Sequence, residues 1–164
     1  MRHAAVKPAS IRPASIKPVL NAIALALIAS ASIACAAAEP EFFPRKAEPG
    51  KSYPFSEAVQ AGQMLYLSGE IGLDATGKLA PGGIKAETKQ VMDNIGANLA
   101  RHHSSFDNVV QCTAALADMA EWPAFNDVYK GYFGKHFPAR MAYGASGLAL
   151  GARVEIQCNA VVDK

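Results

Sequence analysis

One long stretch of helical periodicity, set between segments with strand periodicity, is the feature that most restricts the fold of this 164-residue chain. The interior-type residues recur three and four positions apart, at Ile84, Thr88, Val91, Met92, Ile95 and Leu99. This spacing predicts a helix of about 18 residues with one buried stripe. Such a helix needs a flat apolar surface to pack on, and the flanking segments have the composition to provide one.

The flanking segments predict a sheet. Two short apolar runs, Ala58–Ala61 and Met64–Ser68, are separated by Gly62-Gln63, which is hairpin spacing. Further along, the pattern predicts a strand over 109–117, a second amphipathic helix over 121–133, short apolar runs near 141–143 and 148–150, and a final strand over 153–162. Two helices and five or six strands indicate an α+β sandwich, with both helices on one face of a single sheet. The other sheet face then needs a partner, for which a homo-oligomer is the natural solution.

The first 38 residues are typical of an export signal. They carry Arg2, Lys7, Arg12 and Lys17 but no acidic residue, then an uncharged apolar run from Val19 to Cys35 and small residues up to Ala38. This order predicts a signal peptide over 1–38 with an A-x-A cleavage site. An uncleaved anchor or lipidation at Cys35 are the alternatives, and only these two would bring the protein to a membrane. In every case we expect a periplasmic or secreted location.

The remaining chain divides into a proline-bearing arm over residues 39–52, which we expect to be irregular, and one domain over 53–164. The whole sequence has 16 basic and 14 acidic residues. Removing the four basic residues of the predicted signal leaves 12 against 14, a charge of −2. We therefore expect no nucleic-acid partner, because binding to phosphates needs a basic surface.

Few residues of the domain carry a recognisable chemical signature. The sequence has no G-x-S-x-G elbow, no phosphate-binding loop and no cofactor motif. Adjacent His102 and His103 cannot share a metal on one helix face, so we expect neither metal nor cofactor. Cys112 and Cys158 lie in apolar strand segments, where buried free thiols are the default and a disulfide is the alternative.

Arg140 and Glu155 remain as candidates. Arg140 opens an apolar segment after Phe137-Pro138-Ala139. Glu155 lies between Val154 and Ile156 and must point to the opposite side of its strand from both. The pattern alone leaves two readings for Glu155: an ordinary exposed strand residue, or a carboxylate placed at a site.

Five short motifs in order extend the interpretation. They are Pro54-Phe55-Ser56-Glu57-Ala58-Val59, Leu67-Ser68-Gly69-Glu70-Ile71-Gly72, Phe125-Asn126-Asp127-Val128-Tyr129, Phe137-Pro138-Ala139-Arg140 and Val154-Glu155-Ile156-Gln157-Cys158. With this set the domain resembles the Rid family of reactive intermediate deaminases, also called the YjgF family. The resemblance implies a chorismate-mutase-like fold, with one mixed sheet and two helices on one face. It also implies a homotrimer whose sites lie in clefts between subunits.

The resemblance further implies hydrolysis of 2-imino acids, such as 2-iminopropanoate, to 2-keto acids and ammonia without metal or cofactor. Arg140 matches the arginine that holds the substrate carboxylate, a group that a guanidinium fork fits with two hydrogen bonds. Glu155 matches the acidic residue that positions the attacking water. Ser68 and Gly69 match a strand-end pair near the ligand, and Asn126 matches an asparagine that supports the pocket.

By the same resemblance Phe55 is a candidate substrate-binding residue, but it departs from the family pattern, because a tyrosine is common at its position. The alternative function is therefore a non-catalytic trimer that binds small carboxylates in the same clefts, since Arg140 is present and the tyrosine hydroxyl is absent. RNA cleavage and a chaperone-like role are weaker alternatives. Substitution of Arg140 separates the two leading readings from the chaperone, which would not need a carboxylate clamp.

Overall fold

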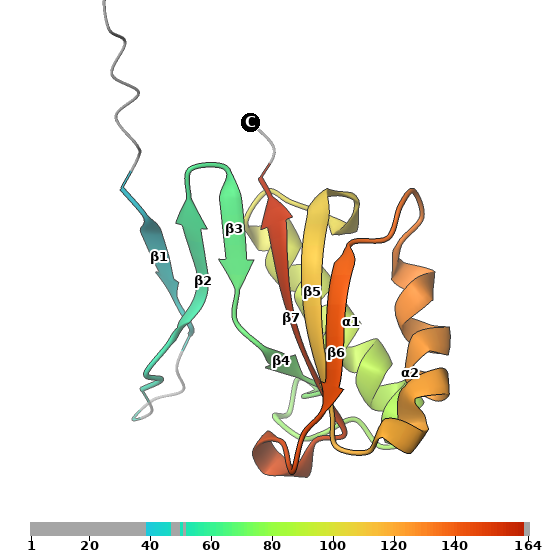
Figure 1. Cartoon of the computed structure of the whole chain (residues 1–164). Coiled ribbons are helices and arrows are strands. Elements are labelled where there is room, and N and C mark those ends of the chain that lie inside the picture. Colours follow the sequence, from blue (N-terminus) through green and yellow to red (C-terminus); the bar gives the residue numbers. More distant parts are fainter. Residues whose placement is uncertain (1–38, 47–49, 51, 163–164) are drawn as a thin grey trace, which may run out of the picture. The chain divides into compact units, whose positions relative to one another are not determined.

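The computed structural model describes residues 39–46, 50 and 52–162 of the chain (Figure 1). The predicted signal peptide over residues 1–38 lies outside the described residues, as does Cys35. The strands are β1 (Glu41–Pro44), β2 (Ser56–Ala61), β3 (Met64–Leu67), β4 (Glu70–Ile71), β5 (Val109–Leu116), β6 (Ala139–Gly144) and β7 (Val154–Val161). The α-helices are α1 (Gly83–Arg101) and α2 (Trp122–Tyr129). No helix among the described residues is both long and apolar enough to cross a membrane.

The strands form one mixed sheet in the order β1-β2-β3-β7-β5-β6, and the short β4 pairs with the other half of β7 (Figure 1). All neighbours are antiparallel except β5 and β6, which are parallel. A parallel pair needs a crossover connection, and α2 provides it. The long strand β7 therefore lies at the centre of the sheet and holds β3, β4 and β5 in register.

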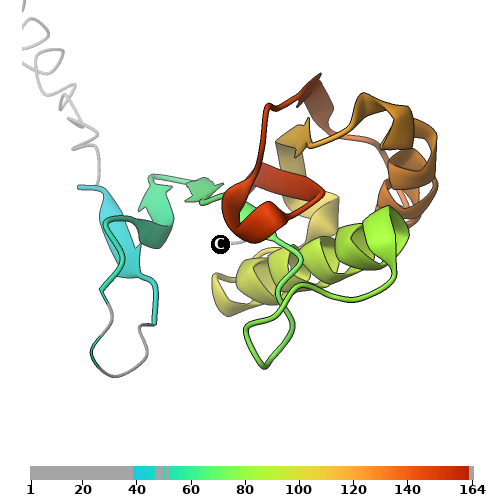
Figure 2. The same ribbon diagram turned by 90° about the horizontal axis from the view of Figure 1, so that it is seen from below.

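Both helices lie on the same face of the sheet (Figures 1 and 2). The predicted stripe of α1 is buried, and Val91, Met92, Ile95 and Leu99 are fully enclosed. Strand β7 alternates strictly, with Val154, Ile156, Cys158 and Ala160 buried beneath the helices and the residues between them half-buried on the other face. The predicted α+β architecture, one mixed sheet with two helices on one face, is thus confirmed.

Two local predictions differ from the structure. Residues 41–44, expected to be irregular, form β1, which pairs antiparallel with β2. Pro40 precedes this edge strand and Pro44 is its last residue, and an edge strand tolerates the missing N–H of proline. The second helix is shorter than predicted, because α2 ends at Tyr129 and a 3-10 turn over Lys130–Tyr132 follows. Gly131 lies in that turn and favours the early end of the α-helix.

Cys112 and Cys158 form a disulfide across β5 and β7. They are directly opposite in the strand register, with their Cα atoms 4.1 Å apart, and both side chains are fully buried. Of the two states that the sequence left open, the structure therefore has the pair oxidised. The bond joins the central strand β7 to β5. Strand β5 in turn pairs with β6, the strand that carries Arg140.

Candidate functional site

Arg140 lies on β6, at the edge of the sheet, and its side chain reaches over α2. Its Nη1 atom donates a hydrogen bond of 2.8 Å to Oδ1 of Asn126. The guanidinium carbon lies 4.7 Å from the ring centres of both Trp122 and Tyr129 and 5.6 Å from that of Phe125. These four partners are spaced i, i+3, i+4 and i+7 along α2, so one helix face presents them all. Stacking on aromatic rings and one amide acceptor leave the other N–H donors of Arg140 available.

A cavity of about 400 Å³ opens beside this arginine. It is lined by Asn126, Tyr129, Lys130, Phe137, Pro138 and Arg140. Two of these side chains are cationic, and the Lys130 ammonium also forms an ion pair of 3.0 Å with Asp127, which lowers the pKa of that carboxyl. A cationic wall with apolar neighbours suits a small anion that carries an apolar group, such as an organic carboxylate.

Glu155 lies on β7 and faces the other side of the sheet. Its Cα partners are Ala115 of β5 and Ile71 of β4. A cavity of about 280 Å³ adjoins its half-buried carboxylate and is also lined by Thr113, Tyr143 and Gln157. A recess that combines polar and apolar side chains around a carboxylate can hold water close to it, as a general base requires.

Gly69 fixes how closely the backbone approaches this carboxylate. A Cβ atom at Gly69 would lie 3.2 Å from Cδ of Glu155 and would overlap its Oε1 atom. A side chain at position 69 would therefore have to displace the Glu155 carboxylate. Ser68 is engaged within the chain: its Oγ donates to the Ser56 carbonyl at 2.6 Å and its N–H to the Glu57 carbonyl at 3.0 Å. These two bonds hold the end of β3 against β2, directly before Gly69.

Phe55 is exposed and packs with the arm of the chain. Its ring centre lies 5.5 Å from that of Tyr53 and 5.9 Å from the guanidinium carbon of Arg45. The side chain provides apolar surface and no hydroxyl. These ring contacts of Phe55 are with the arm, and none of them is with Arg140 or Glu155.

The strand register separates Arg140 and Glu155 within one chain. Arg140 is the Cα partner of Cys112, which is bonded to Cys158, so these three residues share the helix-covered face. Glu155 is three residues from Cys158 on the same strand and therefore occupies the opposite face. Within one chain, Arg140 lies with Asn126 in one cluster, and Glu155 lies with Gly69 in another.

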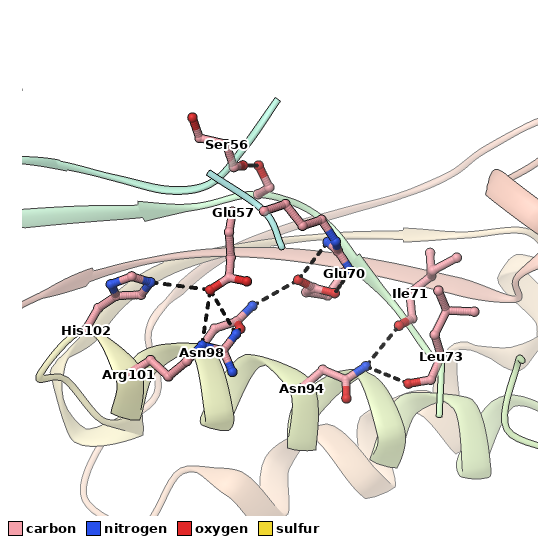
Figure 3. Close-up of polar contacts among 11 residues, drawn as sticks. Ser56, Glu57, Glu70, Ile71, Leu73, Asn94, Asn98, Arg101 and His102 are labelled. Carbon is pink, nitrogen blue, oxygen red and sulfur yellow. Dashed lines mark hydrogen bonds and ion pairs between the residues drawn. The ribbon is translucent and has the colours of Figure 1, made fainter. Parts of the chain in front are cut away.

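A third polar cluster lies between α1 and the strands β2 and β4 (Figure 3). Buried Glu70 accepts hydrogen bonds from Asn98 Nδ2 at 2.9 Å and Arg45 Nη1 at 3.2 Å. Beside it, Arg101 donates to Glu57 at 2.8 Å. Burial raises the pKa of Glu70, and the nearby Arg45 charge opposes that shift. Because both acids have a cationic partner, this cluster serves to join the arm, α1 and the sheet.

The sequence analysis did not predict that Trp122 and Tyr129 stack with Arg140. It identified these two residues only as part of an apolar helix face. The signal that could have found them is the i, i+7 separation that puts them on the same helix face as Asn126. In the described part of the chain, no three His, Cys, Asp or Glu side chains gather into a group that could hold a metal ion.

The sequence was compared with known families and proteins. A sequence profile of the endoribonuclease L-PSP family matches residues 45–162. A goat (Capra hircus) protein named 2-iminobutanoate/2-iminopropanoate deaminase is 48% identical over 109 residues, covering 66% of this chain and 80% of that protein. The human protein of the same name is 41% identical over 114 residues, covering 69% of this chain and 83% of that protein.

Solved structures of the same kind match the fold. The structure of a Rid-family protein of unknown function from Yersinia pestis aligns with a TM-score of 0.69 at 34% identity, covering 76% of this chain and 100% of that one. RidA from an Antarctic Psychrobacter aligns with a TM-score of 0.65 at 30% identity, covering 73% of this chain and 94% of that one. The resemblance found in the motifs is confirmed, and the chain belongs to the endoribonuclease L-PSP family, the group of the YjgF and Rid proteins.

Proposed function

We propose that the protein hydrolyses 2-imino acids to 2-keto acids and ammonia, without metal or cofactor, at sites formed between copies of the chain. The observation that carries this proposal is the held but accessible guanidinium of Arg140, bonded to Asn126 and stacked on Trp122 and Tyr129. Curated relatives that are 41–48% identical carry the name 2-iminobutanoate/2-iminopropanoate deaminase, which supports the same reaction here.

The chemistry needs little machinery. Arg140 binds the substrate carboxylate with two parallel hydrogen bonds and so fixes the position of the neighbouring imine carbon. A water held by Glu155 gives up a proton to the Glu155 carboxylate and adds to the carbon of the protonated imine. Glu155 then returns the proton to the nitrogen, and the C–N bond breaks to release ammonia while Glu155 accepts the hydroxyl proton. Transfer of that proton to the ammonia gives ammonium and restores the carboxylate. One water is consumed, and the products are the 2-keto acid and ammonium.

The separation of Arg140 and Glu155 on opposite sheet faces supports a site built from two subunits. The uncovered face exposes Met141 and Tyr143, whose side chains are 57% and 48% accessible. Large apolar side chains exposed on a sheet face favour contact with another copy. We infer a homotrimer in which Arg140 of one subunit meets Glu155 of the next.

A mixed-oligomer experiment tests both the reaction and the assembly. Arg140→Ala and Glu155→Gln chains, each inactive alone, are co-expressed with different tags, and the mixed oligomers are isolated. An amino-acid oxidase supplies 2-imino acids, and semicarbazide traps those that remain. If each site takes one residue from each of two subunits, a mixed trimer of either composition has one intact site in three, and about a third of wild-type activity returns. No recovery in the mixed oligomers would contradict a shared site.

The second candidate is a non-catalytic carboxylate-binding protein, and Phe55 is the observation that favours it, because it offers no hydroxyl to substrate or water. Wild-type protein that binds pyruvate but leaves the trapped imine unchanged would establish this reading. Phe55→Tyr is the informative variant: a large rise in turnover without tighter binding would show that the native residue disfavours catalysis. RNA cleavage, which the family description suggests, is disfavoured by the charge of −2 over residues 39–164.

We further propose that the protein acts outside the cytoplasm, in the periplasm or after secretion. The disulfide between Cys112 and Cys158 supports this location, because such bonds persist in oxidising compartments. Fractionation of cells that express the whole chain, with mass determination of the mature protein, tests the location. The measured mass distinguishes cleavage before Glu39, lipidation at Cys35 and an uncleaved leader.

A further inference from the structure

The hydroxyl of Tyr129 is a buried polar group without a partner. Tyr129 is 4% exposed, and its Oη atom has no hydrogen-bond partner among the residues that the structure describes. A buried hydroxyl left unpaired is costly, and native proteins keep few of them. Tyr132, three residues further on, shows the usual arrangement: its hydroxyl contacts the Lys89 carbonyl at 3.1 Å and Oδ1 of Asp93 at 2.8 Å.

This hydroxyl belongs to a side chain of the Arg140 cluster. The guanidinium carbon of Arg140 lies 4.7 Å from the Tyr129 ring centre, and both side chains line the cavity of about 400 Å³. Burial raises the pKa of Tyr129 to about 12, although the nearby Arg140 charge opposes the shift. The group is therefore a neutral O–H at physiological pH and can donate a hydrogen bond.

We propose that the Tyr129 hydroxyl is a substrate-binding group, which donates a hydrogen bond to the carboxylate that Arg140 holds. The inference rests on the proposed function insofar as it takes the ligand to be a carboxylate. Arg140 is exposed, lies over the Tyr129 ring and lines the same cavity, so a carboxylate bound by the guanidinium lies next to the Tyr129 side chain. Phe55 contributes no donor, so Tyr129 supplies a phenolic hydroxyl beside Arg140.

Tyr129→Phe tests the proposal, because it keeps the ring under Arg140 and removes only the oxygen. Pyruvate binding is measured by calorimetry, turnover by the trapping assay, and stability by thermal unfolding. We expect pyruvate affinity and kcat/KM to fall about 10- to 100-fold, the usual range for a hydrogen bond to a charged group. We expect the melting temperature to stay the same or rise, because the substitution removes an unpaired buried hydroxyl. Tyr132→Phe is the matched control and should lower stability while leaving binding unchanged.

The outcomes separate this inference from the proposed function. Pyruvate affinity and turnover of Tyr129→Phe within twofold of wild type would overturn the inference, and so would a loss of binding that accompanies an equal loss of stability. Wild type that turns over no imino acid, yet binds pyruvate more tightly than Tyr129→Phe does, would refute the deaminase and support the role of Tyr129. Wild type that binds no carboxylate would overturn both.

Discussion

The disulfide between Cys112 and Cys158 allows a quantitative prediction about stability. It joins residues that are 46 apart in sequence, so in the unfolded chain it closes a loop of that length. The chain-entropy relation gives about 4 kcal/mol of stabilisation for such a loop at 25 °C. Both sulfurs are fully buried in the native state, so a reductant must wait for opening of the strands before it reaches them.

Guanidinium unfolding with and without a strong reductant measures this contribution. We expect the reduced protein to be about 4 kcal/mol less stable, which moves the midpoint by roughly 1 M for a domain of this size. Protein concentration must be held constant, because unfolding of an oligomer depends on it. The Cys112→Ala/Cys158→Ala variant is the control, and its midpoint should not respond to the reductant.

Two results would refute this reasoning. Equal midpoints for the oxidised and reduced protein, with a thiol assay confirming two additional thiols after reduction, would show that loop closure contributes nothing measurable. Rapid reduction under native conditions, at the rate of an exposed disulfide, would show that β5 and β7 open far more readily than their burial implies.

Three further substitutions follow from the site and its surroundings. Gly69→Ala should lower kcat roughly 100-fold by displacing the Glu155 carboxylate, while pyruvate affinity measured by calorimetry changes little. Asn126→Ala should raise KM about 10-fold with little effect on kcat, because Arg140 loses its acceptor; an unchanged KM in steady-state kinetics would contradict this. Glu70→Gln concerns stability: burial raises the pKa of Glu70, so the folded protein binds this proton more tightly than the unfolded chain. The contribution of Glu70 to stability therefore falls as pH rises above 4.5, and melting curves of the variant should depend less on pH from there to neutrality.

Local periodicity was sufficient to predict the elements that carry their own pattern. Helix α1 has a long one-sided stripe, and β7 alternates along its whole length, so both were predicted from neighbouring residues alone. Strand β1 has four residues, the last of them a proline, and β4 has two. These short strands exist because β2 and β7 offer open backbone partners, and a local sequence pattern does not contain that information.

The pairing of Cys112 with Cys158 is a second feature that local sequence does not determine. Each cysteine lies in an apolar strand, which predicts burial but not its partner. Pairing depends on the register of β5 against β7, and that register shifts between Val109 and Gln111, close to Cys112. Without that irregularity, Cys112 would have faced the other side of the sheet. A sequence-based argument could therefore only leave the free thiols and the bond as alternatives.

The site depends on that register even more strongly. Resemblance identified Arg140 and Glu155, but which face each occupies follows from the pairing of β6 with β5 and of β5 with β7. That pairing places the carboxylate clamp on the face that carries the helices and the acid on the uncovered face. A monomer with this register cannot bring the two groups to one substrate without breaking the sheet that holds them. The proposed reaction therefore needs a second copy of the chain, so dilution below the dissociation constant of the oligomer should abolish activity while each folded chain keeps its Arg140 cluster intact.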